Sequence, residues 1–472
     1  MKRKVIKKTR NDYNHNHLPE LKEHALKNSI REGAAANISS SLGDSYIIPF
    51  ALALNAQPIH IGILSSISGF LYQIAQLLGT KEMESNPRKK IVLRFVLLQA
   101  LIWLFVSFTA FAVWKNLFDG YSIWLLIALY SLLMFLSGIA YPAWFSWMGD
   151  IVQEENKGEY FSKRNRIASI FGLIATLSAA FFLDYYKTKG YILVAFGVLF
   201  ALAFLFRFIS YFYLQNQYAP EFKQKKRDYF SFFAFIRKYD NFGKFAVYQG
   251  FFNLAIMIAS PFFNVYMLQV LGFSYTTFTI ATISYTLFYL FFLPLAGKFS
   301  DRYGNRRLTI ITNIFFIMTP LLYILAKGPI SVILLPQLSA GIASACSVIS
   351  FTNFTYDAVS RKHRSRCIAY TNLLIGIGTL LGALTGGLIA SYFHPAGISP
   401  YIFVFIIAAT SRGLVALFFL PQIKEVRKVK KLPTEYTLFT HPLNFIHVES
   451  IRLVHLQKKV LGKFKSLKLL QI

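Results

Sequence analysis

The sequence predicts an all-α integral membrane protein whose 12 transmembrane helices form two related six-helix halves. Three observations predict this fold class. Of the 472 residues, 55% are hydrophobic and only 15% are charged, whereas a soluble domain carries about 25% charged residues. Twelve apolar runs are each long enough to cross a bilayer. Several short motifs recur at offsets of 205 to 218 residues.

Each expected span is a run of about 20 apolar residues bounded by charge, Gly or Pro, which is the length that crosses a hydrocarbon core of about 30 Å. The spans are residues 33–55, 58–79, 91–113, 121–148, 167–183, 190–214, 245–271, 274–297, 308–326, 329–353, 367–393 and 398–420. The first ten residues are basic, but no apolar run follows until residue 33. We therefore expect no cleavable signal peptide.

The basic residues predict the orientation. The N-terminal segment, the loops after every second span and the C-terminal tail hold 43 of the 50 Lys and Arg residues, and the loops on the other side hold four. Because positive charge in short loops resists translocation, both termini are expected in the cytoplasm, with the chain in the plasma membrane. The basic residues then face anionic lipid on the inner leaflet, which attracts each by about 1 kcal/mol. A net charge of +29 therefore requires no nucleic-acid partner.

The spans and the charge pattern divide the chain into five parts. They are a cytoplasmic N-terminal segment at 1–32 with a short amphipathic helix over 19–32, an N-terminal bundle at 33–214, a central cytoplasmic loop at 215–244, a C-terminal bundle at 245–420 and a basic cytoplasmic tail at 421–472. The end of the tail, 449–472, fits either an amphipathic helix on the inner leaflet or a disordered basic segment.

The repeat is clearest in the loops. GKFSDRYGNRR at 297–307 follows the eighth span, and the partial copy GTKEMESNPRK at 79–89 follows the second. Asp150 and Asp357 follow the fourth and tenth spans, and Arg207 and Arg412 lie within the sixth and twelfth. Matching positions in the same order indicate two copies of one six-helix unit.

These features resemble the major facilitator superfamily of secondary transporters, in which the motif G-x-x-x-D-R-x-G-x-R-R follows the second helix of a half. The resemblance implies a central cavity lined mainly by helices 1, 4, 7 and 10 that opens alternately to either side. The helix 5 motif of drug–proton antiporters and the sugar-porter signature after helix 6 are both missing.

The loop motif at 297–307 predicts a gate at the cytoplasmic end. Gly297 would let two helices approach closely, and Asp301 would accept hydrogen bonds from the amides that start helix 11. Gly304 supplies the turn, and the cations meet lipid phosphate or carboxylates; the cations assigned to the motif are Arg302, Arg306 and Arg307. The alternative is a topology signal that only holds the loop inside.

Two arginines lie about 10–12 Å inside the membrane by helical rise. An arginine at that depth either snorkels outward or pairs with an acid. We expect Arg207 to pair with Asp150, or alternatively with Glu154, and Arg412 to pair with Asp357. Because both members recur in each half, the pairs are interpreted as structural.

Polar and aromatic residues at helical spacing mark the candidate cavity. They are Asn37, Ser41, Gln73, Gln76, Tyr130, Tyr141, Trp144, Gln249, Asn253, Asn264, Tyr285, Tyr289 and Gln337. For each one alone, an interhelical hydrogen bond is the competing interpretation. Asp44 is the only acid inside the twelve expected spans and lies near the midplane, so it is the candidate for proton or cation coupling, against an ion pair with Arg207 or a carboxyl satisfied by Asn37 and Ser41.

The predicted function is secondary active transport of a small solute by alternating access, and Asp44 is the predicted coupling residue if the transport is coupled to protons or another cation. The alternatives are an exporter of hydrophobic, drug-like compounds and a non-transporting sensor or scaffold on the same fold. The sequence has no P-loop and no cluster of acids and histidines within the spans, so we expect neither an ATP-driven pump nor an enzyme. No cofactor or metal is predicted, both cysteines are interpreted as packing residues, and the protein is expected to be a monomer.

Overall fold

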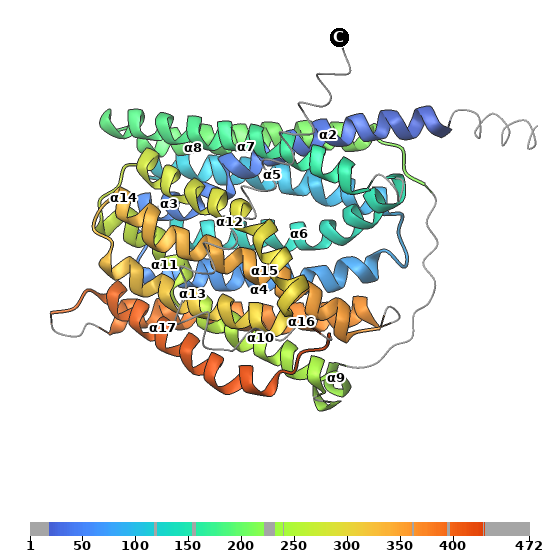
Figure 1. Cartoon of the computed structure of the whole chain (residues 1–472). Coiled ribbons are helices and arrows are strands. Elements are labelled where there is room, and N and C mark those ends of the chain that lie inside the picture. The colour runs from blue at the N-terminus through green and yellow to red at the C-terminus, as the bar shows by residue number, and fades with distance from the viewer. Residues whose placement is uncertain are drawn as a thin grey trace, which may run out of the picture.

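The computed structural model describes residues 18–117, 120–152, 157–220, 232–238, 240–360, 363–393, 397–427 and 429. Within these residues every regular element is helical, and eleven helices are long and apolar enough to cross a membrane. Figure 1 shows the N-terminal half, with α2, α5, α7 and α8, stacked on the C-terminal half, with α10, α13 and α17. The predicted tail helix at 449–472 lies outside the described residues.

The N-terminal half consists of α2 (Leu18–Leu42), the 3₁₀ turn η1 (Asp44–Tyr46), α3 (Ile47–Ala53), α4 (Pro58–Glu82), α5 (Arg88–Trp114), α6 (Ser122–Ile151), α7 (Lys157–Thr188) and α8 (Ile192–Gln215). α9 (Phe232–Lys238) lies in the region between the halves. Pro58 at the first turn of α4 and the reciprocal Gln57 and His60 contacts begin that helix cleanly.

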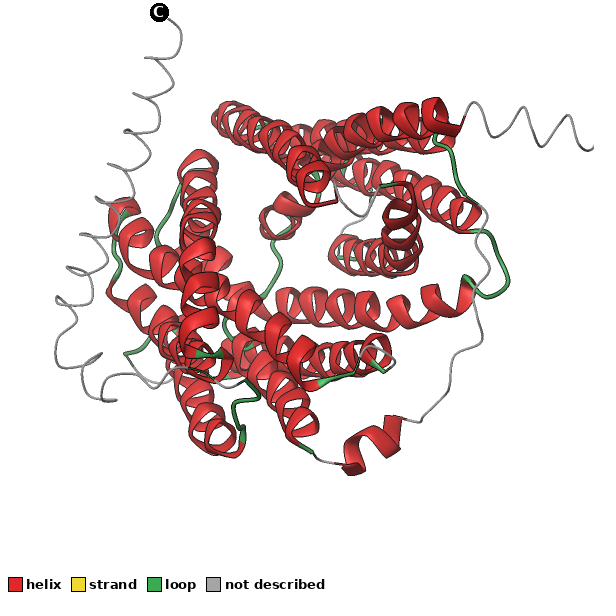
Figure 2. Ribbon diagram, turned by 45° about the vertical axis from the view of Figure 1, so that its right-hand side comes forward, coloured by secondary structure: helices red, strands yellow, loops and turns green. Residues whose placement is uncertain are grey.

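The C-terminal half consists of α10 (Asn241–Met257), α11 (Ser260–Val265), the π-helical η3 (Tyr266–Val270), α12 (Tyr275–Tyr303), α13 (Asn305–Leu325), α14 (Pro329–Val332), the π-helical η4 (Ile333–Gln337), α15 (Leu338–Ala358), α16 (Arg364–Tyr392), α17 (Pro400–Phe419) and the 3₁₀ turn η5 (Leu420–Gln422). Asp240 and Ser274 cap α10 and α12 by accepting from backbone amides three residues on. Figure 2 shows that helices joined by loops make up the described part of the chain, with no strand.

The first span differs from the prediction in two ways. Residues 19–32 do not form a separate surface helix, because α2 runs unbroken from Leu18 to Leu42 and buries Asn28, Ser29 and Glu32. The span then breaks at Gly43, where a Cβ atom would lie 2.4 Å from the Trp103 ring. The break sets Asp44 in a turn between two helices rather than on a continuous helical face.

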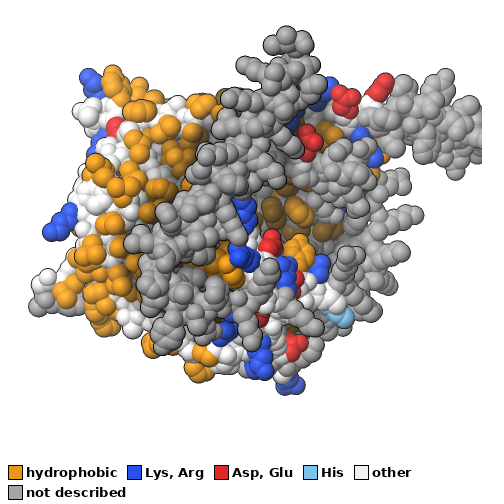
Figure 3. Space-filling view, in the orientation of Figure 1, with side chains coloured by type: hydrophobic (Ala, Val, Ile, Leu, Met, Phe, Trp, Pro, Cys, Tyr) orange, Lys and Arg blue, Asp and Glu red, His pale blue; other side chains and the backbone are white. Residues whose placement is uncertain are grey.

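The ends of the bundle differ in charge. We call the end that carries 79–90, 157–166, 298–307 and 424–427 the basic end, which is the predicted cytoplasmic side. In Figure 3 most Lys and Arg side chains gather in the right-hand part of the molecule, and hydrophobic side chains cover much of the left-hand part. An apolar belt beside a charged rim fits a protein that lies across a bilayer.

The apolar core is continuous at the opposite end and divided at the basic end. One cluster joins both halves, with Tyr46, Phe196, Phe262 and Phe405 among its buried members. At the basic end, separate clusters lie in the N-terminal half around Trp147 and in the C-terminal half around Phe245. Among the described residues, the buried apolar clusters of the two halves therefore join at the end away from the basic residues, while α4 and α16 also meet further along, at Gln73 and Gly376.

Hydrogen bonds cross between the halves at this opposite end. The Asp184 carboxylate on α7 accepts from the backbone amides of Tyr275 and Thr276, each at 2.8 Å, and so caps the start of α12. The hydroxyl groups of Tyr46 and Thr279 lie 3.1 Å apart. An acid at a helix N-terminus also interacts favourably with the helix dipole.

Candidate functional site

A polar cavity of about 240 Å³ lies inside the N-terminal half. Its lining residues are Glu32, Ala36, Tyr72, Val92, Val96, Gln99, Ser137, Ala140, Tyr141, Trp144, Arg164, Arg207 and Leu214. We call it the basic-end cavity. Two of the predicted cavity residues, Tyr141 and Trp144, line it, together with Arg207, which was predicted only as a structural cation.

A buried ion pair forms one wall of this cavity. Arg164 Nη2 lies 2.7 Å from Glu32 Oε2, and the two side chains are 9% and 5% exposed. Arg164 Nε donates to Ser29, the Ser210 hydroxyl donates to Glu32 Oε1 at 3.2 Å, and the guanidinium lies 4.7 Å from the centre of the Trp144 ring. These partners offset the large cost of burying both charges.

A second cavity, of about 170 Å³, continues from the first and is lined by Ala36, Ser39, Ser40, Asp44, Gln99, Trp103, Leu133, Met134, Ser137 and Arg207. We call it the Asp44 cavity. Arg207 donates through Nε and Nη2 to Gln99 Oε1. The Ser40 hydroxyl donates to Asp44 Oδ2 at 2.6 Å, and Tyr130 lies beside the carboxyl group.

Asp44 also borders a third cavity, of about 210 Å³, between the two halves. The predicted Asn264 lines it together with Tyr46 and Thr279. Because the chain breaks at Gly43, the Asp44 carboxyl group lies where the interior of the N-terminal half meets the interface. A solute or a proton that moved along these cavities would pass this carboxylate.

Two neighbours predicted for Asp44 lie elsewhere. Asn37 Oδ1 and Ser41 Oγ both face Gly172 of α7, where an added Cβ would meet them at 2.0 and 2.9 Å. The alternative prediction that Asn37 and Ser41 satisfy the Asp44 carboxyl group is wrong, because the helix ends at Leu42 and the following turn redirects Asp44. Ser40 is the residue that bonds the carboxylate.

Most other predicted cavity residues make hydrogen bonds within or between helices. Gln76 donates to Gln73, Asn253 of α10 donates to Ile375 and Thr379 of α16, Tyr285 of α12 donates to Ser344 of α15, and Gln337 donates to the Tyr323 hydroxyl. Gln249 is buried, and Tyr289 packs beside Gly341. These contacts match the competing interpretation that a polar residue in a span joins helices.

The predicted charge pairs have different partners. Asp150 lies 2.6 Å from Arg88 Nη1, and Asp357 lies 2.6 Å from Arg427 Nε and accepts from Asn305. Arg207 instead bonds Gln99. Glu154 lies outside the described residues. The two acids lie at the basic end, where they pair with Arg88 at the start of α5 and with Arg427 after α17.

Arg412 pairs with no acid in the described part of the chain. It donates to the carbonyl oxygens of Phe316, Ala255 and Ile256, at 2.6, 3.3 and 3.0 Å. Pro320 has no N–H to bond the Phe316 carbonyl four residues earlier, and α10 ends at Met257 before Pro261. Pro320 therefore leaves the Phe316 carbonyl free for Arg412, whereas the Ile256 carbonyl at the helix break accepts from both Arg412 and the Ala259 amide.

The loop motif at 297–307 contacts the segment after α17. Gly304 joins α12 to α13 at φ +93°, and an added Cβ would lie 2.3 Å from Glu425 Oε2. That carboxylate accepts from the Arg306 amide at 2.8 Å, while Asp301 is 75% exposed and lies 3.6 Å from Arg427. The predicted contact of Asp301 with helix 11 is therefore wrong for this structure, and no atom would lie within 4 Å of a Cβ at Gly297. Arg302 packs over the Tyr303 ring.

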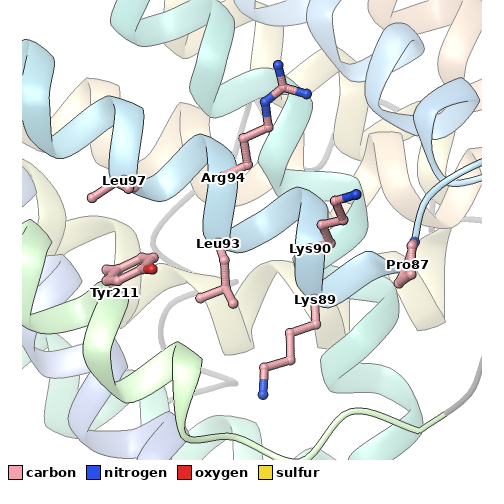
Figure 4. A pocket seen from close by; sticks show the side chains of 7 residues that line it. All are labelled: Pro87, Lys89, Lys90, Leu93, Arg94, Leu97 and Tyr211. Atoms are coloured by element: carbon pink, nitrogen blue, oxygen red, sulfur yellow. The ribbon is translucent and has the colours of Figure 1, made fainter.

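An open groove of about 480 Å³ lies on the surface between α5 and α8, lined by Pro87, Lys89, Lys90, Leu93, Arg94, Leu97 and Tyr211. Figure 4 shows Lys90 and Arg94 pointing to one side of α5, and Leu93 pointing to the other, towards Tyr211. Lys89 donates to the Gln217 carbonyl at 2.8 Å. The groove combines cations with apolar side chains and lies apart from Asp44.

The sequence missed three site residues. Glu32 was placed before the first span and Arg164 in a basic loop, so neither was considered for the interior. Gln99 is the one amide in its expected span, 91–113, which is the signal that could have identified it.

The fold and cavities define a multi-pass membrane transport protein with two related six-helix halves. The family model "Major Facilitator Superfamily" matches residues 34–242 and 245–467, and the chain belongs to that superfamily. Its fold is similar to the nucleoside transporter NupG (TM-score 0.61, 16% identity, 86% of this chain and 99% of that one). It is also similar to a bacterial homologue of the lysosomal transporter Spinster in an inward-facing, unoccupied conformation (TM-score 0.61, 13% identity, 88% and 99%).

Among curated proteins, the chain is similar to Multidrug resistance protein 2 of Bacillus subtilis (strain 168), with 25% identity over 154 residues. The match covers 32% of this chain and 36% of that protein. Multidrug resistance protein 1 of the same organism is 24% identical over 155 residues, with 32% and 39% covered. The chain thus matches little more than a third of the length of these relatives.

Proposed function

We propose that this protein carries a small solute across the plasma membrane by alternating access, and that Asp44 couples the movement to protons. The observation that carries the proposal is the position of Asp44, which borders both the Asp44 cavity and the cavity between the halves. A group that couples a gradient to a solute has to be reachable from the solute path, and this carboxyl group borders it on two sides.

The direction of opening follows from the divided core. The halves share apolar packing and hydrogen bonds at the end away from the basic residues, whereas each half has its own core at the basic end. Under the predicted orientation, with both termini in the cytoplasm, this is a state closed to the outside. Gly62 of α4 meets Gly387 of α16. Rocking of the halves about these two helices would open the end away from the basic residues and close the basic end.

Proton coupling has a specific physical basis. Burial disfavours a charged carboxylate, whereas a neighbouring cation favours it, and Asp44 shares its cavity with Arg207. If rocking changes the distance between them, the proton affinity of Asp44 changes with the state. Binding and release of a proton would then accompany each cycle.

The test uses proteoliposomes with an imposed proton gradient. Asp44→Asn should abolish uphill accumulation of the solute yet permit exchange of labelled for unlabelled solute. Glu23→Gln, a change in an exposed acid near the N-terminus that pairs with Lys27, should leave both activities intact. Uphill accumulation by the Asn variant would contradict coupling at Asp44.

A second candidate, export of drug-like compounds, is favoured by the multidrug resistance proteins among the relatives and by the aromatic Tyr141 and Trp144 in the basic-end cavity. It differs in one measurable respect. An exporter lowers the accumulation of a lipophilic cation such as ethidium in cells that express it, and an importer of polar solutes does not.

The partners proposed are the solute and anionic lipid of the inner leaflet. The groove between α5 and α8 combines cations with apolar side chains, which fits an anionic lipid whose headgroup lies near Lys90 and Arg94. No contact of the described residues requires a second copy of the chain, and we propose a monomer.

A further inference from the structure

We infer that the N-terminal half contains the solute-binding site and that its ligand is a small zwitterion with a carboxylate and an ammonium group. The inference rests on the proposed transport function and names the substrate class for it. Three buried polar atoms that have no hydrogen-bond partner among the described residues carry it: Gln99 Nε2, Trp144 Nε1 and Asp44 Oδ1. A buried polar atom without a partner is costly, so each indicates a missing ligand atom or a water.

The Gln99 amide has only one possible orientation. Arg207 can only donate hydrogen bonds, so the amide oxygen of Gln99 must face it. The NH₂ group therefore points away from Arg207 as an unpartnered donor. Gln99 is 3% exposed and lines both the basic-end cavity and the Asp44 cavity.

Donor groups without a partner among the described residues line these two cavities. Arg207 uses Nε and Nη2 on Gln99, which leaves Nη1 without a partner among the described residues. Arg207 and Gln99 line both cavities, and Trp144 lines the basic-end cavity. A carboxylate accepts up to four hydrogen bonds from donors of this kind. Glu32 does not compete, because Arg164 and Ser210 occupy its oxygens.

The opposite requirement holds at Asp44. Its Oδ2 accepts from Ser40, and Oδ1 has no partner that meets full hydrogen-bond geometry, although the Tyr130 hydroxyl is close enough to donate to the carboxyl group. An ammonium group donates to this oxygen and supplies the matching charge. The Asp44 cavity, of about 170 Å³, has the volume of about five or six waters, which fits a short carbon chain between the two charged groups.

The charge balance excludes the simpler ligands. A plain cation would leave the donors of Gln99 and Trp144 unpaired, and a plain anion would face the Asp44 carboxylate. A neutral diol can bond both ends but gains neither charge-assisted interaction. A site with buried polar groups discriminates strongly against an analogue that lacks the matching polar atom. This discrimination is far larger than that of a hydrophobic pocket against a ligand that lacks one methylene group.

The test compares four probes of nearly equal size on the purified full-length protein: γ-aminobutanoate, n-butylamine, butanoate and butane-1,4-diol. Binding is measured by calorimetry and by the shift in apparent melting temperature. We expect the zwitterion to bind at least about tenfold more tightly than each of the others. A series from glycine to δ-aminopentanoate then finds the best spacing between the two charges. No preference for any zwitterion in that series would overturn the inference and leave water as the occupant.

Variants identify the atoms that bind. Trp144→Phe keeps the ring over Arg164 but removes the donor, so it should weaken binding of both the zwitterion and butanoate. Trp124→Phe is the matched control, since this indole packs on His60 away from the cavities. Asp44→Asn should remove the advantage of the zwitterion over butanoate while butanoate still binds. An unchanged advantage in Asp44→Asn would contradict the ammonium contact.

The outcome is separable from that of the proposed function. If a solute of another class accumulates against its gradient and Asp44→Asn abolishes the accumulation, the transport proposal stands and the zwitterion is rejected. If the zwitterion binds but is never transported, the site assignment stands and the transport proposal fails.

Discussion

At the scale of single residues, the two repeated arginines show how matching positions acquire different environments. Arg207 shares cavities with Asp44 and Glu32 and bonds a side-chain amide. Arg412 lies 205 residues later and binds the Phe316 carbonyl, which Pro320 leaves free, together with carbonyl groups near the break after Met257. The first arginine faces a space where a ligand fits, and the second is fully used in holding α10, α13 and α17 together.

Arg412→Leu should lower the free energy of unfolding by about 1–3 kcal/mol, because buried carbonyl oxygens lose their donor. Asp357→Leu should not rescue it, since Asp357 pairs with Arg427. The losses of the two single variants should add within about 0.5 kcal/mol in the double variant, as expected for independent sites. Thermal unfolding of the purified variants measures this. If the double variant recovered part of the lost free energy of unfolding, this result would support the Arg412–Asp357 pairing that the sequence predicted.

At the scale of elements, the loop motif at 297–307 contacts the segment after α17. The sequence predicted a contact with the eleventh span, which corresponds to α16. Glu425 bonds the start of α13, Arg427 joins Asp357 and Asp301, and Asn241 bonds both backbone groups of Lys424. Gly304 is needed twice, for its positive φ and for the space that Glu425 fills. In this structure the motif therefore binds the segment that follows α17.

Gly304→Ala should destabilise the protein by about 1–2 kcal/mol, since an L-residue is strained at that φ and its Cβ displaces Glu425. Glu425→Gln keeps the shape but removes the charge at the start of α13, and it should cost less than 1 kcal/mol. Limited proteolysis after residue 423 reports whether the segment has been released. Gly413→Ala is a suitable control, because no atom lies within 4 Å of the added Cβ. Equal melting temperatures for Gly304→Ala and Gly413→Ala would contradict the docking role.

The groove between α5 and α8 gives a second prediction at this scale. Lys90→Gln with Arg94→Gln should reduce retention of phosphatidylglycerol relative to phosphatidylcholine several-fold, because each exposed cation attracts anionic lipid by about 1 kcal/mol. Native mass spectrometry of protein released from mixed-lipid nanodiscs measures the ratio. Lys163→Gln with Arg166→Gln removes the same charge from the basic end of α7 and serves as the control. An equal loss in both double variants would mean general attraction without a lipid site.

At the scale of the whole molecule, the shared core and the Asp184 cap hold the two halves together at one end. The contact is built from a side chain of one half and the helix start of the other, so it can exist only when that end is closed. Under the proposed alternating access, such a contact would stabilise the state closed at that end and would be lost in the other.

Asp184→Asn should shift the balance towards the state open at that end, because an amide carries no charge for the α12 dipole and accepts through one oxygen only. We expect a shift of about 1–2 kcal/mol, or roughly five- to thirtyfold in the population ratio. Distances between spin labels at residues 117 and 328, on opposite halves, would report the change. An unaltered distance distribution would show that the cap does not control closure.

The sequence by itself determined eleven of the twelve expected spans and the family, because hydropathy and loop charge are local properties that each segment carries alone. It also identified Asp44, Tyr141 and Trp144 as candidates for the polar interior. It did not identify the partners, because these depend on how each helix is rotated and where it ends. Glu32 lies in the interior because α2 extends back to Leu18. Asp150 pairs with Arg88, which is 62 positions away in the sequence, and not with Arg207. Only the tertiary structure decided that one arginine faces a cavity and its counterpart binds carbonyl groups, since that difference arises from a proline and a helix break in neighbouring helices.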